Sequence, residues 1–504
     1  MNGKILLVFI VWLFFVASCT KKSDSSSHSP TQEVESLISE PDYDSMSAEN
    51  KYLIAKKLAA TLYKGISPEE FFNLTDRIGD IKPEYDNGFL ESMREKLNTP
   101  LSVDEKYMII QRINEKYVFD DVGYPQKILT MLFEFPLSKD YFNMWMAYFL
   151  ANTILFSPAL ELESVDYIDT HRVFQRLYTM ISEDRSIRDI AYEHMISQEN
   201  WRRFRSPEDN TREMMEIFLR RFIDEEVPKA SKACQNWYLT DDTQGYSLVI
   251  DFNENTEPQD VLDTWVTNCY EFYRAIVEHK DFMPTIVGTI VRYLFSSYSE
   301  DKQKEITEAV LSKNPVTFRD VFTLLLFSRE YLLNVERPKY FEELFFSTAH
   351  SIKWKPSAYF FKNIYHIYWK PAGWSSLQEM KQAPLTYKLG REPVLPLDYL
   401  SFAYYHKGVR DLLMIKRSTD EFSPYDYGWK VEFIDNLLEG EEFIHYIFLS
   451  TLGRRATQKE VQKLTEIFNY LGYEESFTSK DERALIILDY ISRLPEFYVF
   501  KAIK

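Results

Sequence analysis

Apolar residues recur at helical spacing along nearly the whole chain after about residue 46. One such stripe ends at Gly65 and consists of Tyr52, Leu53, Ala55, Leu58, Ala59 and Leu62. Positions three and four residues apart lie on one face of an α-helix, so each stripe predicts an amphipathic helix that packs against others. The pattern predicts a mainly α protein built from multi-helix bundle subdomains.

Four predicted helix starts share one chemistry, a Ser or Thr followed three residues later by Glu. In this capping box both side chains bond backbone N–H groups that the first helical turn leaves without partners. The intervals between the boxes are irregular, whereas a solenoid needs a fixed period, so bundles are favoured over a repeat array. The boxes are Ser67–Glu70, Ser102–Glu105, Thr457–Glu460 and Ser479–Glu482.

Two segments break the helical pattern. Residues 237–252 carry β-branched and aromatic residues on both sides of a polar turn, which predicts one small β-hairpin inserted among the helices. Residues 370–396 contain several prolines and two glycines, which predicts a long irregular segment. We place three helical subdomains at residues 46–135, 136–336 and 337–504.

The N-terminus has the pattern of a secretory signal with a lipid-attachment site. Lys4 precedes an uninterrupted apolar run at residues 5–16, which is too short to span a membrane. The run ends in Val-Ala-Ser-Cys and resembles the lipobox of bacterial lipoproteins, in which the thiol of Cys19 takes the lipid. Residues 1–18 would then be removed as a signal peptide. The alternative is a plain cleavage site with a cysteine beside it by chance.

The residues after Cys19 indicate which bacterial membrane would hold the protein. Residues 19–45 begin as a polar, serine-rich stretch that predicts a flexible tether. Thr20 follows the cysteine, where an Asp tends to retain lipoproteins at the inner membrane, so the bacterial outer membrane is favoured. The lipid would be the contact with the membrane, and the chain would face the periplasm or the cell surface.

Composition excludes some partners and leaves others open. The 504 residues include 59 Lys and Arg against 77 Asp and Glu, a net charge of −18, which disfavours nucleic acid. The chain lacks phosphate-binding and zinc-protease motifs, so no cofactor or metal is predicted. Glu442 and His445 form one ExxH pair, but a di-iron bundle needs two.

Cys234 and Cys269 are the cysteines left after Cys19. Outside the cytoplasm a disulfide between them is feasible, because oxidising compartments permit such bonds. Two buried free thiols are the alternative, and the sequence does not decide between the two.

Several segments between residues 141 and 333 resemble, in the same order, the DUF-eighteen-hundred family of secreted bacterial proteins. The most specific is SPEDNTREMMEIFL at residues 206–219. In the segment YFNMWMAYF, Trp145 occupies the family's tryptophan position, while Tyr148 stands where the family has a histidine. The resemblance implies a helical core with a short hairpin and no settled activity. It also implies an envelope protein partner, because the family accompanies secreted sulfatase-like proteins.

The helix that starts at Ser206 carries the candidate chemistry. Glu213 and Glu216 are candidate catalytic carboxylates if they line a cleft, with Arg212 lowering their pKa. The alternative is a ladder of surface ion pairs through Arg212, Glu216 and Arg220.

Four tryptophans are candidate binding residues: Trp145, Trp237, Trp369 and Trp374. The alternative is that the aromatic stripes are buried between helices. Together these observations predict a lipid-anchored cell-envelope protein that acts as a binding or assembly module, with a groove near Ser206 and the hairpin.

The alternative function is an envelope glycan-acting hydrolase or accessory enzyme that uses Glu213 and Glu216 as acid and base. Two acids on one helical turn flank one side of a substrate, whereas a retaining glycosidase holds its carboxyl groups on both sides of the bond. Geometry therefore favours the binding module, and catalysis is not predicted.

Overall fold

The predicted capping boxes form wherever the structure describes them. In the computed structural model the hydroxyl and backbone N–H of Ser67, Ser102 and Thr457 each donate to the Glu three residues later, at 2.7–3.1 Å. Because these bonds satisfy the free N–H groups of the first turn, each helix begins at the residue that the sequence predicted. Further helices begin with a serine whose side-chain oxygen accepts the backbone N–H three residues later, at Ser47, Ser138, Ser186, Ser197, Ser206 and Ser299.

The structure describes most of the chain in nine continuous ranges and a few single positions. These are residues 36–73, 80–114, 124–155, 168–221, 224–242, 245–251, 257–353, 440–471 and 480–504, with residues 382, 385, 387, 389–394, 402, 403, 406 and 438. The predicted signal peptide with Cys19, the candidate binding residues Trp369 and Trp374, and the Ser479 cap lie outside the described residues.

The mainly helical fold is confirmed. Helices of the first third are η1 Tyr43–Ser45, α2 Ala48–Thr61, α3 Pro68–Phe71, α4 Pro83–Asp86, α5 Phe89–Asn98, α6 Val103–Asn114 and α7 Tyr124–Glu134. The middle holds α8 Lys139–Asn152, α9 Ile168–Ser182, α10 Ile187–Met195, α11 Gln198–Arg203, α12 Pro207–Leu219, α13 Val227–Ala233, α14 Cys269–Glu278, α15 Phe282–Leu294, α16 Glu300–Ser312, α17 Phe318–Leu326 and η2 Glu330–Asn334. The last third holds α18 Phe341–Ser351, α22 Gly440–Leu452, α23 Gln458–Leu471, α24 Lys480–Ile491 and η3 Pro495–Tyr498.

Strands are few, short and antiparallel. The predicted hairpin is present as β3 (Trp237–Asp242) and β4 (Gly245–Ile250). The described residues contain three further pairs that the sequence did not predict: β1 Phe72–Asn73 with β2 Asp80–Ile81, β5 Gln259–Val261 with β6 Thr264–Val266, and β7 Arg337–Pro338 with β8 Val499–Phe500.

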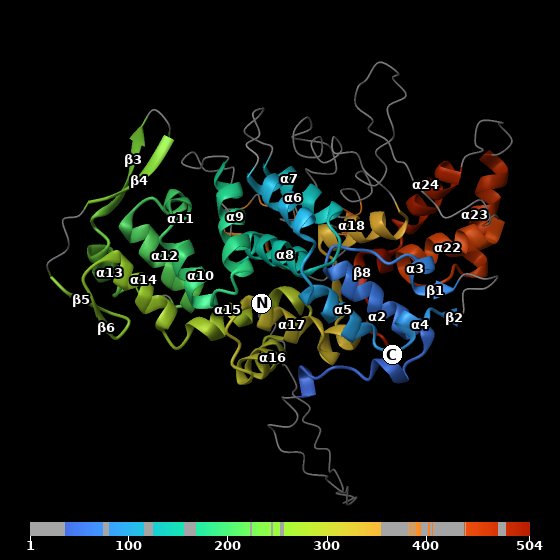
Figure 1. Ribbon diagram of the computed structural model, residues 1–504, viewed down its shortest axis with the longest axis horizontal. Helices are drawn as coiled ribbons and strands as arrows, with labels where there is room; N and C mark the ends of the chain where they lie inside the picture. Colours follow the sequence, from blue (N-terminus) through green and yellow to red (C-terminus); the bar gives the residue numbers. More distant parts are fainter. Residues whose placement is uncertain are drawn as a thin grey trace, which may run out of the picture.

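The elements are arranged along one long axis (Figure 1). The two hairpins β3–β4 and β5–β6 lie at one end, beside α12 to α14. Helices α22 to α24 lie at the other end, near α2, α3 and α18. Helices α8, α15 and α17 fill the middle. The hairpins and the C-terminal helices are therefore at opposite ends of the molecule.

One hydrophobic cluster runs through the described part of the chain, from Ile38 to Ile503. Rings from distant segments meet inside it, as where Tyr63 packs edge-on against Tyr148 and Phe346 at 5.8 and 6.2 Å. The predicted subdomain boundaries near residues 136 and 337 stay predictions, but the core is continuous across both.

The predicted tether is too long at its C-terminal end. Residues 36–45 were assigned to a flexible linker, yet Ile38 and Tyr43 are buried and belong to the core. The backbone N–H of Arg329 also donates to Ser39 O at 2.6 Å. Apolar burial and backbone pairing fix this stretch, so any tether ends before residue 36.

The segment around α2 lies close to α18 and to the C-terminal residues. A Cβ at Gly65, just after α2, would come within 2.3 Å of Ser347 O on α18, so no larger residue fits there. The C-terminal residues then return alongside α2, where Asn50 Nδ2 donates to Lys504 O and Ile503 N donates to Leu333 O.

Two buried ion pairs stand at the start of α18. Arg337 donates to both carboxylate oxygens of Glu343 at 2.6 and 2.7 Å, and Arg391 donates to Glu342 at 2.6 and 2.9 Å. All four side chains are at most 2% exposed. Charges removed from water need such bidentate partners, because desolvating either one alone is costly.

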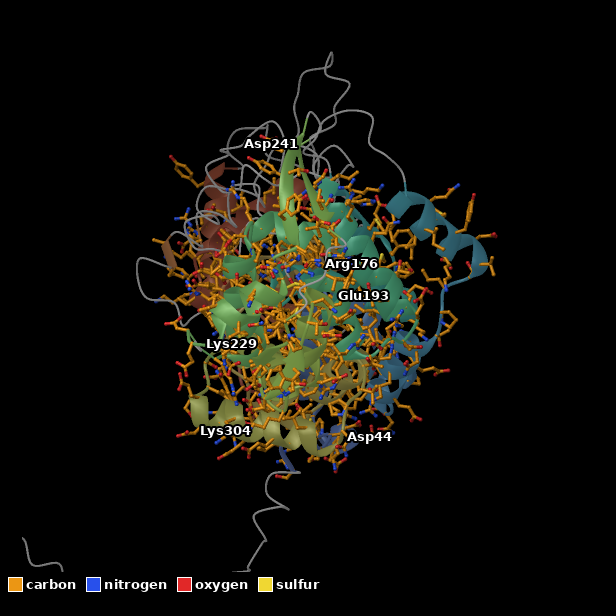
Figure 2. All side chains as sticks on the ribbon, turned by 90° about the vertical axis from the view of Figure 1, so that its left-hand side faces the viewer. Asp44, Arg176, Glu193, Lys229, Asp241 and Lys304 are labelled. Carbon is orange, nitrogen blue, oxygen red and sulfur yellow. A yellow bond between two sulfur atoms is a disulfide. The ribbon has the colours of Figure 1, made fainter. Side chains whose placement is uncertain are left out.

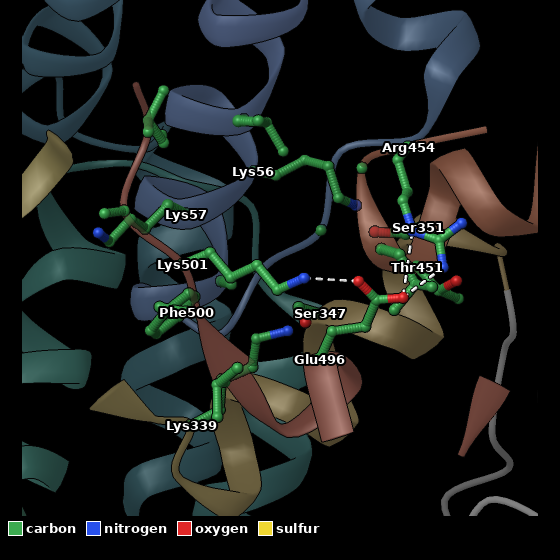
Figure 3. Close-up of a pocket in the computed structure, with 18 residues that line it drawn as sticks. Lys56, Lys57, Lys339, Ser347, Ser351, Thr451, Arg454, Glu496, Phe500 and Lys501 are labelled. Carbon is green, nitrogen blue, oxygen red and sulfur yellow. Dashed lines mark hydrogen bonds and ion pairs between the residues drawn. The ribbon is translucent and has the colours of Figure 1, made fainter. Parts of the chain in front are cut away.

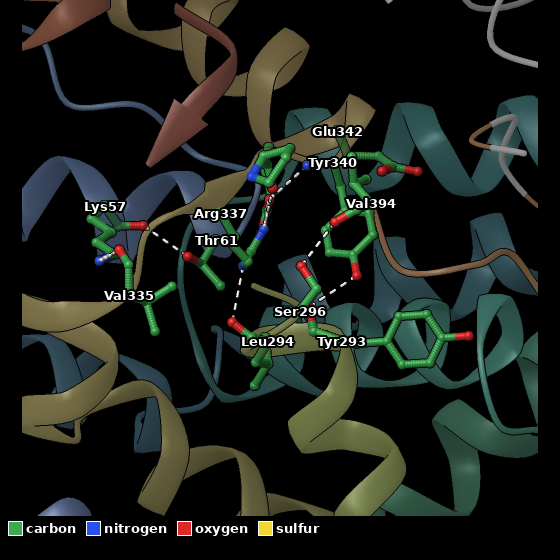
Figure 4. Close-up of polar contacts among 12 residues, drawn as sticks. Lys57, Thr61, Tyr293, Leu294, Ser296, Val335, Arg337, Tyr340, Glu342 and Val394 are labelled. Carbon is green, nitrogen blue, oxygen red and sulfur yellow. Dashed lines mark hydrogen bonds and ion pairs between the residues drawn. The ribbon is translucent and has the colours of Figure 1, made fainter. Parts of the chain in front are cut away.

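Further polar bonds extend this network to other helices (Figure 4). Arg337 Nε donates to Leu294 O at 3.0 Å, and its guanidinium also donates to the hydroxyl of Tyr331, which bonds Thr61 of α2. Tyr148 of α8 donates to Glu342. The network therefore joins α2, α8, α15 and α18, which come from all three predicted subdomains.

Replacing Arg337 by Met should destabilise the protein by about 3–5 kcal/mol, because it leaves Glu343 charged and unpaired in the core. Urea unfolding measures this loss. The double variant Arg337→Met/Glu343→Leu should recover most of it. Arg493→Met, which breaks an exposed pair with Asp489, should cost less than about 1 kcal/mol. A loss at Arg337 no larger than at Arg493 would contradict the role of the buried pair.

Candidate functional site

The helix α12 forms as the sequence predicts. Ser206 caps it by accepting the N–H of Asp209, and Pro207 is its first residue. The predicted apolar face is buried against the core at Met214, Met215, Phe218 and Leu219. The remaining faces of the helix hold the candidate carboxylates.

The predicted ladder of ion pairs along α12 does not form. Arg212 is exposed and pairs with Glu208 at 3.1 Å, one turn before it, and not with Glu216. Arg220 follows the helix in a left-handed conformation, with φ of 51°, and its guanidinium lies 3.5 Å from Thr289 Oγ1. Among the described residues Glu216 has no ion pair with either arginine, because the helix ends before Arg220 can lie above it.

Glu213 interacts electrostatically with an arginine of the neighbouring helix α11. It is half-buried, and its charge acts on Arg203 of α11, which is 2% exposed. Burial lowers the pKa of Arg203, and the carboxylates of Glu213 and Asp169 oppose that effect. Asp169 is itself paired with Arg202 at 2.5 Å. Glu213 therefore belongs to a structural group of charges between α9, α11 and α12.

The predicted binding roles of Trp145 and Trp237 are wrong. Both indoles are 1% exposed, so neither can stack against a ligand. Trp145 donates to Thr61 O at 2.9 Å, and Trp237 packs against Trp201 with ring centroids 5.4 Å apart. The large apolar area of an indole is buried when neighbouring helices leave space for it, and this is the alternative that the sequence had left open.

Cys234 and Cys269 form a disulfide. The bond joins the end of α13 to the start of α14, and both cysteines are fully buried. It therefore encloses both hairpins, β3–β4 and β5–β6, in one cross-linked loop. Of the two alternatives for these cysteines, the disulfide is confirmed.

The β5–β6 hairpin has a strained turn. Leu262 and Asp263 both adopt left-handed backbone conformations, with φ of 54° and 59°. Such a two-residue turn usually contains Asn and Gly, and a Leu there costs about 1–2 kcal/mol. The carboxylate of Glu226 accepts the N–H of Leu262 at 2.7 Å and so holds the turn in place. Strain of this kind is retained where the surrounding structure requires it.

The same hairpin presents a large aromatic side chain to solvent. Trp265 of β6 is 70% exposed, and Tyr270 at the start of α14 is 42% exposed. A cavity of about 360 Å³ lies between the hairpin and α14. Its polar lining consists of Thr264, Glu271, Arg274, Glu278 and His279. We call Trp265, Tyr270 and this cavity the hairpin-end site.

The charges around the hairpin-end site are mixed. Burial lowers the pKa of His279, and nearby Arg221 lowers it further, so the ring is neutral near pH 7. Glu271 accepts the N–H and hydroxyl of Thr267 at 2.7 and 2.8 Å, next to Asn268, which caps α14 by accepting the N–H of Glu271. Arg274 lies over the ring of Tyr192 at 4.1 Å. The site thus combines an apolar platform with fixed polar groups, as binding sites do.

Figure 2 views this end of the molecule directly. Asp241, at the tip of the β3–β4 hairpin, projects beyond the helices, while Arg176 and Glu193 lie over the helices below it. Neither Glu213 nor Glu216 is among the residues that line the hairpin-end cavity. The carboxylates and the exposed aromatic side chains are therefore on different parts of this end.

Other candidate chemistry has no counterpart in the described residues. Glu442 and His445 lie on α22, but no three His, Cys, Asp or Glu side chains in this part of the chain are grouped as a metal would need. Likewise, no helix among the described residues is long and apolar enough to cross a membrane.

Comparison with known proteins assigns no relative. No family model matches the chain, and no curated protein or solved structure matches it significantly. The resemblance to the DUF-eighteen-hundred family therefore stays a prediction from the quoted residues, and the argument for function depends on the site itself.

Removing the disulfide by Cys234→Ser/Cys269→Ser should lower the free energy of unfolding by about 3–4 kcal/mol, since the bond closes a long loop. Chemical denaturation of both forms under non-reducing conditions measures the difference. Alkylation of the unfolded wild type should label these two cysteines only after reduction. Labelling without reductant would show that the bond is absent.

Proposed function

We propose that this protein is a lipid-anchored component of the bacterial cell envelope that acts as a binding or assembly module. In this proposal Cys19 carries the lipid, residues 1–18 are removed, and the folded part is held at the outer membrane. The supports are the lipobox-like sequence before Cys19 and the polar stretch that follows it. Catalysis is not part of the proposal.

The observation that carries the binding role is the exposure of Trp265. A tryptophan loses much favourable burial when 70% of it faces solvent, and here the strained turn of Leu262 and Asp263 ends two positions before it. The hairpin is secured by Glu226 on one side and lies within the loop of the disulfide. A rigid support for an exposed indole is what a contact residue of an interface needs, because little entropy is lost on binding.

The alternative, a glycan-acting hydrolase that uses Glu213 and Glu216, has less support. The charge of Glu213 acts on the buried Arg203, so this carboxylate belongs to the structural group of charges between α9, α11 and α12. Both carboxylates are on one side of α12, and neither lines the cavity beside the β5–β6 hairpin or the cavity between α2 and α18. A binding role needs no such arrangement.

We propose an envelope protein as the partner at the hairpin-end site. An exposed Trp that lines a pocket with polar groups and an Arg has the composition of a protein interface, in which aromatic residues and Arg are enriched. The family resemblance points to a secreted sulfatase-like protein as one such partner. The net charge of −18 argues against nucleic acid.

A photo-crosslinking amino acid placed at Thr264, beside Trp265, should capture one specific envelope protein in intact cells. Adding Trp265→Ala should reduce the yield of that product by about tenfold, because a central Trp contributes 2 kcal/mol or more to an interface. Immunoblotting and mass spectrometry of the crosslinked product measure this.

Tyr470→Ala is the matched control, because Tyr470 is also an exposed aromatic residue, at 84%, and lies on α23 at the opposite end of the molecule. The product should persist in this variant. Equal crosslinking in the Trp265 and Tyr470 variants, or no specific product in the parent, would contradict the proposed interface.

The anchor is tested separately by metabolic labelling with palmitate. The wild type should incorporate label and should fractionate with the outer membrane, whereas Cys19→Ala should incorporate none, since the thiol is the only point of attachment proposed. Equal labelling of both forms would exclude lipidation at this residue without affecting the hairpin-end site.

A further inference from the structure

A second cavity, of about 230 Å³, lies at the opposite end of the molecule from the hairpins. Its walls come from α2, from α18, from the turn after α22 and from the chain's last residues, 499–503 (Figure 3). These four segments are far apart in sequence. We call this the cationic cavity, for the reason that follows.

Positive side chains dominate the lining of this cavity. Among the described residues that line it, Glu496 is the single acidic one, and the basic ones are Lys56, Lys57, Lys339, Arg454 and Lys501. In a chain with a net charge of −18, such a concentration is unexpected from composition. Figure 3 shows Lys56, Lys339, Lys501 and Arg454 directed toward the region around Glu496.

Glu496 is already occupied. It accepts from the guanidinium of Arg454, at 3.1 Å from Nε, and from Lys501 at 2.6 Å. Arg454 is also paired with Glu460 at 2.9 Å. The carboxylates near the cavity therefore pair with Arg454 and Lys501, whereas Lys56, Lys57 and Lys339 donate to backbone carbonyls.

Lys56 and Lys339 are partly buried and donate to backbone carbonyls. Lys56 donates to Ser450 O at 2.5 Å, and Lys339 donates to Phe497 O at 3.0 Å. In the described part of the chain Lys56 has no carboxylate within ion-pair distance. The partly buried ammonium of Lys56 therefore carries an electrostatic cost, which an anion in the cavity would remove.

A buried hydroxyl provides a second, independent observation. Ser351 of α18 lines the cavity, is 1% exposed, and its Oγ has no hydrogen-bond partner among the described residues. Buried polar atoms are nearly always satisfied, so an unsatisfied one that lines a cavity indicates a missing acceptor or donor. An anionic oxygen would accept the hydroxyl proton of Ser351.

Apart from the hydroxyl groups of Ser347 and Thr451, the rest of the lining is mainly apolar, and it limits which ligands fit. Leu53 and Ala60 of α2 contribute, as do Leu452, Phe500 and Ile503. The cavity is smaller than the 300–1,000 Å³ that drug-sized ligands occupy. It therefore suits a charged group with a short apolar part.

We propose that the cationic cavity binds the phosphate group of a small phosphomonoester with a short apolar substituent, held by Lys56, Lys339 and Ser351. Lysine is a common point-charge ligand of phosphate. Two or more lysine amines pair better with the two negative charges of a phosphate dianion than with the single charge of a carboxylate ligand. A bound phosphate would also contact the chain's last residues and so fasten them between α2 and α18. This site is independent of the hairpin-end site and of the lipid anchor.

The proposal makes binding dependent on pH. Burial lowers the pKa of Lys56 to about 7 and that of Lys339 to about 8. The charged groups that act on these two lysines are Glu70, Arg337, Glu343, Glu496 and Lys501, and the lysines act on each other. Because a dianion favours the protonated amines, binding should take up protons near pH 8, and affinity should fall as pH rises from about 7 to 9.

Isothermal titration of the purified full chain with hexyl phosphate tests the site. Hexyl phosphate should bind more tightly than inorganic phosphate, and hexanoate should bind more weakly. Titration at pH 8 in buffers of different ionisation enthalpy should show proton uptake. Lys56→Met and Lys339→Met should each weaken binding by about tenfold or more. Glu496→Gln should tighten it, because it releases Lys501 and Arg454 toward the ligand.

The control is Lys304→Met, which removes the same charge from an exposed position on α16 and should leave affinity unchanged. Lys56→Met should fold, since it removes a poorly solvated amine, and thermal melting checks this. Vesicles that contain phosphatidic acid test whether the phosphate belongs to a lipid head group or to a free ester. If it belongs to a lipid head group, the wild type should bind these vesicles and Lys56→Met should not. Absence of heat with hexyl phosphate, or equal affinity of Lys56→Met and Lys304→Met, would overturn the proposal.

Discussion

The paired carboxylates of Glu342 and Glu343 are the interaction on which the rest of the structure depends. They stand next to each other at the start of α18, both buried, and each is matched by its own arginine from a different segment. Arg337 comes from the strand that pairs with the chain's last residues, and Arg391 comes from the short described segment at 389–394. Because a buried carboxylate without its cation is costly, these two pairs fix where both segments must lie.

This arrangement also explains why the two candidate sites are at opposite ends. The hairpin-end site depends on a loop closed by the disulfide and on Glu226, and it needs nothing from the C-terminal helices. The cationic cavity depends on the return of the last residues to α2 and α18, which the Arg337 strand positions. The first site offers an indole to a large partner, and the second offers charge to a small one.

Much of the local structure was predictable from the sequence, because it depends on neighbouring residues. The caps at Ser67, Ser102 and Thr457, the start of α12 at Ser206 and the β3–β4 hairpin all follow from local chemistry.

The candidate sites were not predictable from the sequence. The prediction of Trp145 and Trp237 as binding residues is wrong because residue type does not encode burial. Trp265 was missed because its turn, Leu262-Asp263, lacks the Asn-Gly signal of a tight hairpin. Lys56, Lys339 and Lys501 meet only after three distant segments pack together.

Buried charge at the start of α18 should make the described part of the chain one cooperative unit. Native-state hydrogen exchange at increasing denaturant, read by mass spectrometry of peptides from α2, α8, α18 and α22, tests it most directly. The account predicts that the slowest amides of all four helices share one free energy of opening and the same dependence on denaturant. If the α22 peptides open at a distinctly lower free energy than those of α2 and α8, the C-terminal helices form a separate unit, and the account is contradicted.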